Sequence, residues 1–374
     1  MKRCDKITDC VDHSDENFCH KFGHYGKSYR KNIPPIETTT RRTKLKVKIG
    51  IKSIGRFDEL NMKFSARILV ILKWRDMRLY FNDLHDELNA LDEEEISAIW
   101  KPPLQLHNSL KLLNILNNEF LRVFVKKQSQ GELKNDKELN EGLIYDGKSN
   151  DLTMTAIFDE DFSCFYDLKY YPFDSQICTI EISMPFHLWN QIELVPISIH
   201  HEENGISTAQ FQLKSHEIKT AENETKIIGV LKLKRMPMYH IVLTYLPTFC
   251  LVMMALITLY INESHFESTI MVSLTAMLVM YTLFQSISHE MPSTAYMKFL
   301  DIWLIYCLIL PFIIFIIEVS WQLMHDGILG EIHDFYMTTS QKPKCKIVIQ
   351  ICMPILCAFF ITGYVLSAVY IHLD

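Results

Sequence analysis

The sequence predicts an all-β extracellular sandwich followed by a four-helix transmembrane domain, with a short cysteine-rich module at the N-terminus. Three observations support this prediction. Four long apolar stretches lie after residue 239, short runs of alternating apolar and polar residues fill the part before them, and three cysteines fall within the first 20 residues. A chain of 374 residues is long enough for two or three such domains.

Residues 1–20 form an acidic, cysteine-dense unit, and residues 21–43 have no periodicity and are predicted to be a linker. The chain opens with Met-Lys-Arg-Cys and has no apolar core behind these charges, so these residues are not predicted to be a secretory signal. Because the cysteines are nevertheless of the oxidised, extracellular kind, we expect this start to be a truncated or misassigned N-terminus.

The sandwich is predicted over residues 44–238. Strict alternation begins at Lys44–Ile49, and such alternation is typical of a half-buried strand. Similar runs recur at 64–74, 121–126, 152–157, 177–182, 211–213 and 227–234. Many short strands separated by turn signals favour a β-sandwich. The acidic stretch 83–95 is compatible with a short helix, and we interpret its charges as a solvated face.

The transmembrane domain is predicted over residues 239–374, with helices at about 240–261, 268–287, 302–321 and 347–371. Each stretch has about the ~20 residues that a helix needs to cross ~30 Å of hydrocarbon. Buried helices of a large soluble protein are the alternative. Four such segments, nearly free of charge and crowded into the last third, argue against it. The lipid bilayer is therefore an expected partner. The net charge of −6 and the absence of a long basic run predict no nucleic-acid partner.

The most specific local pattern is a pair of cysteines, Cys164 and Cys178, that enclose thirteen residues. The string Tyr171-Pro172-Phe173-Asp174 lies just before the second cysteine. This string resembles the signature loop of the Cys-loop receptors, the pentameric neurotransmitter-gated ion channels. Further landmarks of that family follow in order over residues 44–374, in the segments 74–79, 100–105, 235, 245–247 and 301–303. The resemblance implies a Cys164–Cys178 disulfide, whereas a plain structural staple of the sandwich is the alternative.

The resemblance also implies that the second membrane helix lines a pore with its hydrophobic gate at Leu278. Helical spacing then predicts a pore-lining stripe that consists of Glu267, Met271, Thr275, Leu278, Thr282, Ser286 and His289. Small polar residues that join neighbouring helices are the alternative. Glu267 stands in the segment where anion-selective members carry Pro-Ala-Arg, so an acidic ring favours cations. Cation-selective members, however, carry this glutamate one position later.

Ligand binding is expected at subunit interfaces, as the resemblance implies. The matching positions are Leu69, His107, Pro185 and Phe186, and residues 219–229 hold no aromatic residue. Three walls of the aromatic cage of amine-binding relatives are thus missing. We expect a small extracellular ligand other than a typical amine: protons, metal ions or an uncharged ligand that reaches His107 and Phe186.

Coupling between the two domains is predicted at their junction. The resemblance pairs Glu59 with Arg235, so that exchanging the two charges should partly preserve the contact. It also makes the tip of the Cys-loop, Tyr171-Pro172-Phe173 with Asp174, press on the linker 293–298, which contains Tyr296.

The N-terminal segment Cys4–Cys19 resembles the second half of a low-density-lipoprotein-receptor class A repeat. This implies a Cys4–Cys19 disulfide and a Ca²⁺ ion, with carboxylates supplied by Asp5, Asp9, Asp15 and Glu16. An acidic tail without a metal is the alternative. Asn223-Glu-Thr225 is a glycosylation sequon, so we expect a glycan at Asn223.

Together these patterns predict one of five like or related subunits of an extracellular ligand-gated ion channel. We expect a multi-pass plasma-membrane protein with an extracellular N-terminus, at a postsynaptic site. The sequence shows no nucleophile motif, phosphate-binding glycine loop or zinc-spaced cluster, so an enzyme is not expected. A non-conducting accessory subunit and a lipoprotein-type surface receptor are the alternatives.

Overall fold

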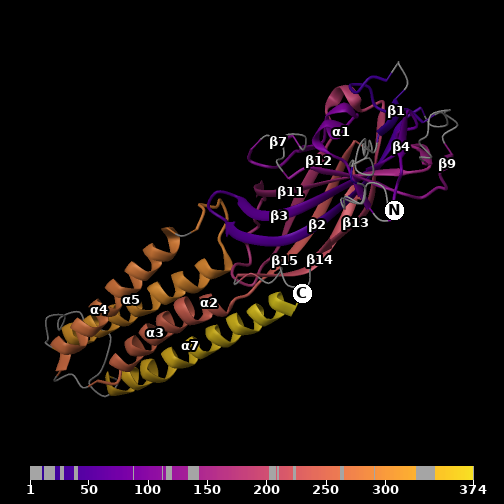
Figure 1. Ribbon diagram of the computed structural model, residues 1–374. Coiled ribbons are helices and arrows are strands. Elements are labelled where there is room, and N and C mark those ends of the chain that lie inside the picture. The colour runs from indigo at the N-terminus through magenta and orange to yellow at the C-terminus, as the bar shows by residue number, and fades with distance from the viewer. Residues whose placement is uncertain are drawn as a thin grey trace.

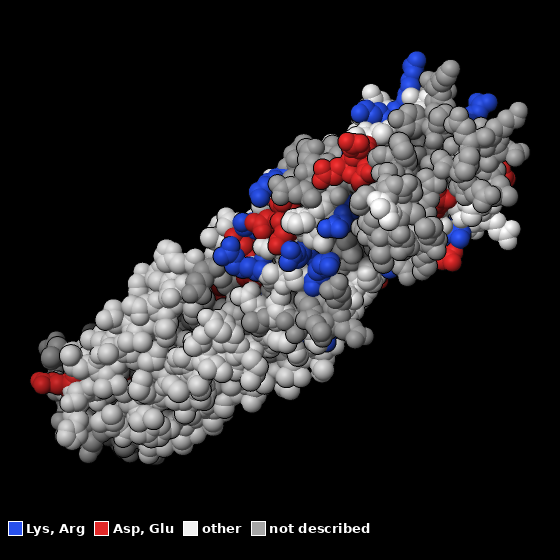
Figure 2. Space-filling model, viewed as in Figure 1, with Lys and Arg blue, Asp and Glu red and all other residues white. Residues whose placement is uncertain are grey.

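The computed structural model describes residues 11, 22–25, 29–37, 41–86, 88–111, 113–114, 120–133, 143–201, 208, 210–221, 225–261, 265–289, 291–325 and 342–373. The molecule is elongated, with a β domain at one end and a bundle of long helices at the other (Figure 1). Charged side chains gather on the β domain, whereas the helices present mainly uncharged surface (Figure 2). This division agrees with the predicted sandwich and transmembrane domain.

Two sheets face each other in the β domain. The six-stranded sheet has the order β13-β2-β3-β11-β8-β5, and the five-stranded sheet has the order β14-β15-β12-β6-β7. The strands of the first are Ile192–His201, Thr43–Asp58, Lys63–Trp74, Asp151–Ser163, Arg122–Lys126 and Leu88–Ala90. Those of the second are Phe211–Thr220, Lys226–Arg235, Ser175–Ser183, Gln105–Leu106 and Leu113–Asn114.

The core of the sandwich follows from strict alternation along the strands. In β3 every second side chain from Phe64 to Trp74 is buried, and in β12 the buried residues include Ile180 and Ile182. A Cβ built on Gly229 of β15 would lie 3.1 Å from Ile199 Cδ1 and 3.5 Å from Ile49 Cδ1, so the two sheets pack closely there. Burying apolar surface between the sheets is what stabilises the domain.

A third, four-stranded sheet changes the predicted start of the sandwich. Its order is β1-β4-β10-β9, with strands Phe22–Tyr25, Leu79–Asn82, Leu143–Asp146 and Glu132–Leu133. The expected linker 21–43 therefore contributes a strand. Tyr29 in the same segment donates to Asp76 Oδ2 at 3.3 Å and accepts from the Trp100 backbone N–H at 2.8 Å. Part of the aperiodic segment thus packs on the sandwich.

The acidic stretch 83–95 also differs from the expected short helix. Helix α1 spans Glu93–Ala98, and Leu88–Ala90 forms strand β5 instead. A capping box explains the start of the helix, because Asp92 accepts from the backbone N–H of Glu95 and the Glu95 side chain accepts from that of Asp92. Helix α1 therefore begins directly after its capping residue, Asp92.

Within the described residues, four helical segments are long and apolar enough to cross a membrane. The first combines α2 (Met238–His240), a π-helical turn (Ile241–Tyr245) and α3 (Leu246–Thr258). The others are α4 (Phe266–His289), α5 (Phe299–His325) and α7 (Lys342–Leu373). The last three extend beyond the predicted bounds. Pro247 lacks a backbone N–H, which accounts for the irregular turn before it.

Candidate functional site

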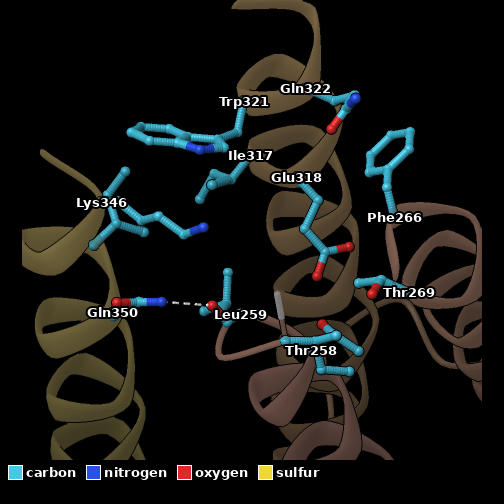
Figure 3. A pocket seen from close by; sticks show the side chains of 12 residues that line it. Thr258, Leu259, Phe266, Thr269, Ile317, Glu318, Trp321, Gln322, Lys346 and Gln350 are labelled. Carbon is cyan, nitrogen blue, oxygen red and sulfur yellow. Dashed lines mark hydrogen bonds between the residues drawn. The ribbon is translucent and has the colours of Figure 1, made fainter. Parts of the chain in front are cut away.

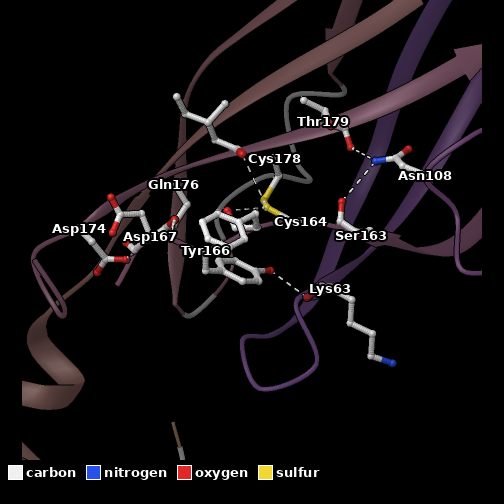
Figure 4. Close-up of a disulfide and its surroundings, with 12 residues drawn as sticks. Lys63, Asn108, Ser163, Cys164, Tyr166, Asp167, Asp174, Gln176, Cys178 and Thr179 are labelled. Carbon is white, nitrogen blue, oxygen red and sulfur yellow. Dashed lines mark hydrogen bonds between the residues drawn. A yellow bond between two sulfur atoms is a disulfide. The ribbon is translucent and has the colours of Figure 1, made fainter. Parts of the chain in front are cut away.

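The loop between β11 and β12 is closed by the Cys164–Cys178 disulfide, with the two Cα atoms 5.1 Å apart (Figure 4). Gln176 holds the loop from inside, since its side-chain oxygen accepts from the Asp167 N–H at 3.0 Å and its amide donates to the Asp167 carbonyl at 2.8 Å. Tyr166 donates to the Lys63 carbonyl at 2.8 Å and anchors the loop to the β2–β3 hairpin. The loop is thus a fixed part of the domain.

The tip of this loop lies directly on the membrane helices. The backbone N–H groups of Phe299 and Leu300, at the start of α5, donate to the carbonyls of Lys169 (2.8 Å) and Tyr171 (3.2 Å). Tyr296 Oη accepts from the Leu168 N–H at 3.0 Å. The Phe173 ring lies 6.1 Å from that of Phe299. Tyr171 and Pro172 are buried in this contact.

Arg235, at the end of β15, is the centre of a buried ionic cluster, which we call the coupling cluster (Arg235, Asp174, Glu59). Arg235 donates to Asp174 at 2.7 and 3.1 Å and to Glu59 Oε1 at 2.5 Å. Its guanidinium also lies 4.6 Å from the centre of the Tyr171 ring. Burial opposes the charge, yet Asp174 and Glu59 raise the pKa of Arg235 above its ordinary value. Arg235 thus stays charged.

The predicted ligand-binding residues are not brought together within one chain. His107 and Phe186 are exposed beside the five-stranded sheet, where the His107 N–H donates to the Glu181 carbonyl at 2.8 Å. Pro185 precedes the short 3₁₀ turn Phe186–Leu188. Leu69 lies in β3 of the other sheet, opposite Gly50 and Ile157. Leu69 and the other three residues thus belong to different parts of the sandwich.

An ion pair beside these positions was missed by the sequence reasoning. Lys226 Nζ lies 2.5 Å from Glu181 Oε2, and both side chains are half-buried on the five-stranded sheet. The register of β12 and β15 brings them close, since Ser183 stands opposite Lys226. In the sequence, the pair is visible only as one acidic and one basic residue in two segments whose apolar and polar residues alternate.

All seven residues of the predicted pore stripe are exposed on α4. Leu278 keeps 64% of its surface exposed and Met271 65%. The opposite face of α4 is buried against the other helices through Thr269, Ser273, Ala276 and Met280. The stripe therefore faces away from the rest of the chain.

Several predicted sites lie outside the described residues. These are the cysteines Cys4 and Cys19, the calcium ligands Asp5, Asp9, Asp15 and Glu16, and the glycosylation residue Asn223. In the part of the chain that the structure describes, no group of three or more His, Cys, Asp or Glu residues has a geometry that could hold a metal ion.

Comparison with known proteins gives a family. The family profile of the neurotransmitter-gated ion-channel ligand-binding domain matches residues 20–244, more than half of the chain. The chain is also 25% identical over 284 residues to the "Gamma-aminobutyric acid receptor subunit beta-like" of Drosophila melanogaster. That match covers 71% of this chain but only 53% of the relative, so the chain spans about half of the relative's length. The chain belongs to the neurotransmitter-gated ion-channel ligand-binding domain family.

Proposed function

We propose that the chain is one subunit of a pentameric, extracellular ligand-gated ion channel of the plasma membrane. The observation that carries this proposal is the direct bonding of the Cys-loop to the start of α5, next to a helix with an exposed polar stripe. One α4 helix per chain cannot enclose a channel, so we infer that five subunits surround one pore. Ligand binding between neighbouring sandwiches would bias a closed–open equilibrium.

The ligand would bind between the side of one subunit that carries His107, Pro185 and Phe186 and the side of the next that carries Leu69. The relative is named for γ-aminobutyric acid, so this compound belongs in the ligand screen. A cationic amine gains ~0.5–2 kcal/mol per aromatic ring, and three missing walls would cost ~1.5–6 kcal/mol. We therefore expect acetylcholine and serotonin not to open a homomer at micromolar concentration. Protons, metal ions or an uncharged ligand are the expected triggers.

Ion selectivity would be set at the first turn of α4. Glu267 is exposed there, and five copies would form an acidic ring that favours cations. The reversal potential should then follow the sodium gradient. A reversal potential that follows chloride would contradict this assignment.

The decisive experiment expresses the chain alone in oocytes and screens transmitters, pH and metal ions under voltage clamp. A ligand-evoked current supports the channel. Current only after co-expression with another subunit would favour an accessory subunit, the second candidate that the missing cage walls suggest. Uptake of lipoprotein without current would favour a surface receptor. A robust current evoked by a low-micromolar amine would show that the ligand-binding residues are wrongly assigned.

The N-terminal segment supports a separate proposal, a partial class A repeat that binds Ca²⁺. Asp5, Asp9, Asp15 and Glu16 offer the hard carboxylate oxygens that Ca²⁺ prefers. Calcium removal by a chelator should then increase proteolysis of this segment, and loss of the four carboxylates should abolish that calcium effect. Equal proteolysis with and without calcium would contradict the proposal.

A further inference from the structure

A cleft beside α1 lies at the end of the sandwich away from the membrane helices (Figure 1). It has a volume of about 630 Å³ and is lined by parts of the segments 31–34, 97–103 and 187–191. We call it the α1 cleft. Small-molecule sites in proteins have volumes of ~300–1,000 Å³, so the α1 cleft has room for a small organic ligand.

The walls of the α1 cleft are held in place by the sandwich. The Trp100 N–H donates to Tyr29 Oη at 2.8 Å, and the ring centres of Trp100 and Trp74 lie 6.0 Å apart. The Gln191 carbonyl accepts from the Thr43 N–H at 2.7 Å. The cleft is thus formed before any ligand arrives, which lowers the free-energy cost of binding.

Two lysines line the α1 cleft without a counter-charge. Lys31 Nζ donates to the Ser97 carbonyl at 3.3 Å, in the last turn of α1. Lys101 is half-buried, and no described residue accepts a hydrogen bond from its ammonium. Among the described residues that line the cleft, none is acidic.

The two ammonium groups lie close enough to repel each other. Burial, and after it the charge of Lys31, lowers the pKa of Lys101 below its ordinary value. No carboxylate of the described residues opposes this shift. A negative charge placed between the two lysines would therefore be attracted by both.

The other groups of the α1 cleft suit an anion that has an apolar body. Each lysine ammonium has three N–H donors and no acceptor, so donors remain for a ligand. The side-chain amides of Asn32 and Gln191 line the same cleft and offer further N–H groups. Apolar surface is supplied by Ile33, Pro34, Ile99, Pro103 and Leu188.

We propose that the α1 cleft binds a small organic dianion, with one oxygen held by Lys31 and another by Lys101. The apolar body of the ligand lies against the wall that includes Ile99 and Leu188. A phosphate monoester has a charge of about −1.5 to −2 at pH 7 and three acceptor oxygens. Its hydrogen bonds to ammonium groups are charge-assisted and therefore strong. A cationic ligand is repelled by the two lysines.

The dianion could be a phosphate monoester or a dicarboxylate, since both offer two negative charges. All residues that line the cleft belong to one chain, so binding requires neither a pore nor a neighbouring subunit. Failure of this proposal would therefore leave the proposed function untouched.

The test uses the full-length protein in dodecyl maltoside at pH 7.5, with phenyl phosphate as the probe. The broadening of its phosphorus NMR signal over a concentration series gives the Kd. Lys101→Met keeps the length of the side chain but loses the ammonium. We expect the Kd to rise about tenfold or more, the effect of one lost charged hydrogen bond.

Lys31→Met keeps the test decisive if Lys101→Met does not fold. Lys31 is exposed, and among the described residues it bonds only to one backbone carbonyl, so its replacement should not disturb the fold. The Kd should again rise about tenfold or more.

Lys111→Met is the matched control, because it removes the same charge from the same domain. The Lys111 side chain is 77% exposed, lies 3.6 Å from Glu160 and does not line the α1 cleft. Its Kd should equal that of the wild type. Equal Kd values of the wild type and the two cleft variants would overturn the proposal, as would an equal rise in Lys111→Met.

Three further compounds define the ligand. Displacement of phenyl phosphate by phthalate would include dicarboxylates among the ligands, and no displacement would restrict the site to phosphate monoesters. Inorganic phosphate has no apolar body and should bind more weakly than phenyl phosphate, so an equal Kd would contradict the apolar wall. Benzylamine is a cation and should not compete, and its competition would overturn the proposal.

Discussion

Replacing Arg235 by Gln should destabilise the protein much more than replacing Glu59 by Gln. Arg235 is 3% exposed, and its loss leaves the carboxylates of Asp174 and Glu59 together without a cation. Breaking a buried ion pair in this way costs about 3–5 kcal/mol. The Glu59 side chain is 15% exposed, and its neutralisation leaves Arg235 on Asp174, so we expect about 1.5 kcal/mol. For a domain of this size each 1 kcal/mol lowers the Tm by about 2–4 °C.

The two variants and their combination form a double-mutant cycle. The quantity measured is the Tm of the detergent-solubilised oligomer, determined by size-exclusion chromatography after heating. We expect losses of about 6–20 °C for Arg235→Gln and about 3–6 °C for Glu59→Gln. The double variant should lose less than the sum, because neutralising Glu59 removes one of the two stranded charges. Strictly additive losses would refute the pairing.

The same geometry revises the expected charge exchange. A glutamate at position 235 would stand next to the carboxylate of Asp174, which lies 2.7 Å from the present guanidinium. Like charges at that distance repel, so Glu59→Arg combined with Arg235→Glu should not restore the wild-type Tm. Adding Asp174→Asn to that exchange should recover part of the loss. Full rescue by the exchange alone would show that Asp174 contributes nothing.

Three further perturbations test other parts of the structure. Leu278→Thr should wet the constriction of the closed pore and produce leak current, and unchanged gating in a conducting channel would show that the pore register is wrong. Tyr296→Phe removes the acceptor of the Leu168 N–H, which should lower the free energy of unfolding by about 1 kcal/mol and the Tm by a few degrees. An unchanged Tm would show that this contact contributes nothing. Burial and two neighbouring histidines lower the pKa of His216 below 6.5, so the unfolded chain takes up a proton before the folded chain does. The stability present above pH 6.5 should therefore fall as the pH drops towards the pKa of folded-state His216. In the variant His216→Gln the Tm should change less between pH 7.5 and 5.5 than in the wild type. Identical pH profiles of the two proteins would contradict a role of His216.

The sequence predicts strands well where burial makes apolar and polar residues alternate, and membrane helices well where apolar residues continue for ~20 positions. Every second residue of β3 is buried, so alternation alone locates the strand. The segment with β1 and Tyr29 has no apolar period, so its sequence predicts a linker, although β1 pairs with β4 and Tyr29 bonds to Asp76 and Trp100. Glu318 does not stand out in the sequence, because one acid hardly changes the hydropathy of a span as apolar as α5.

Contacts between distant residues depend on strand register, which the sequence does not reveal directly. Ser175 stands opposite Lys234 in the β12–β15 pairing, and this places Asp174 beside Arg235. The family resemblance assigns both Asp174 and Arg235 to coupling, but it pairs Arg235 only with Glu59. Register also places Leu69 on β3, in the sheet opposite to the one beside which His107 lies.

The hydrogen bonds from Phe299 and Leu300 to the Cys-loop tie the first turn of α5 to the other domain. A hydrogen bond tolerates a stretch of only a few tenths of an ångström, so a larger displacement of the loop carries the start of the helix with it. At 1.5 Å per residue the 27 residues of α5 extend for about 40 Å, and a tilt at one end becomes a sideways shift at the other. That other end borders the cavity lined by Glu318 and Trp321 (Figure 3). By thermodynamic reciprocity, any molecule that prefers one position of that end would change the affinity for a ligand bound between the sandwiches, and the ligand would change the affinity for that molecule by the same factor.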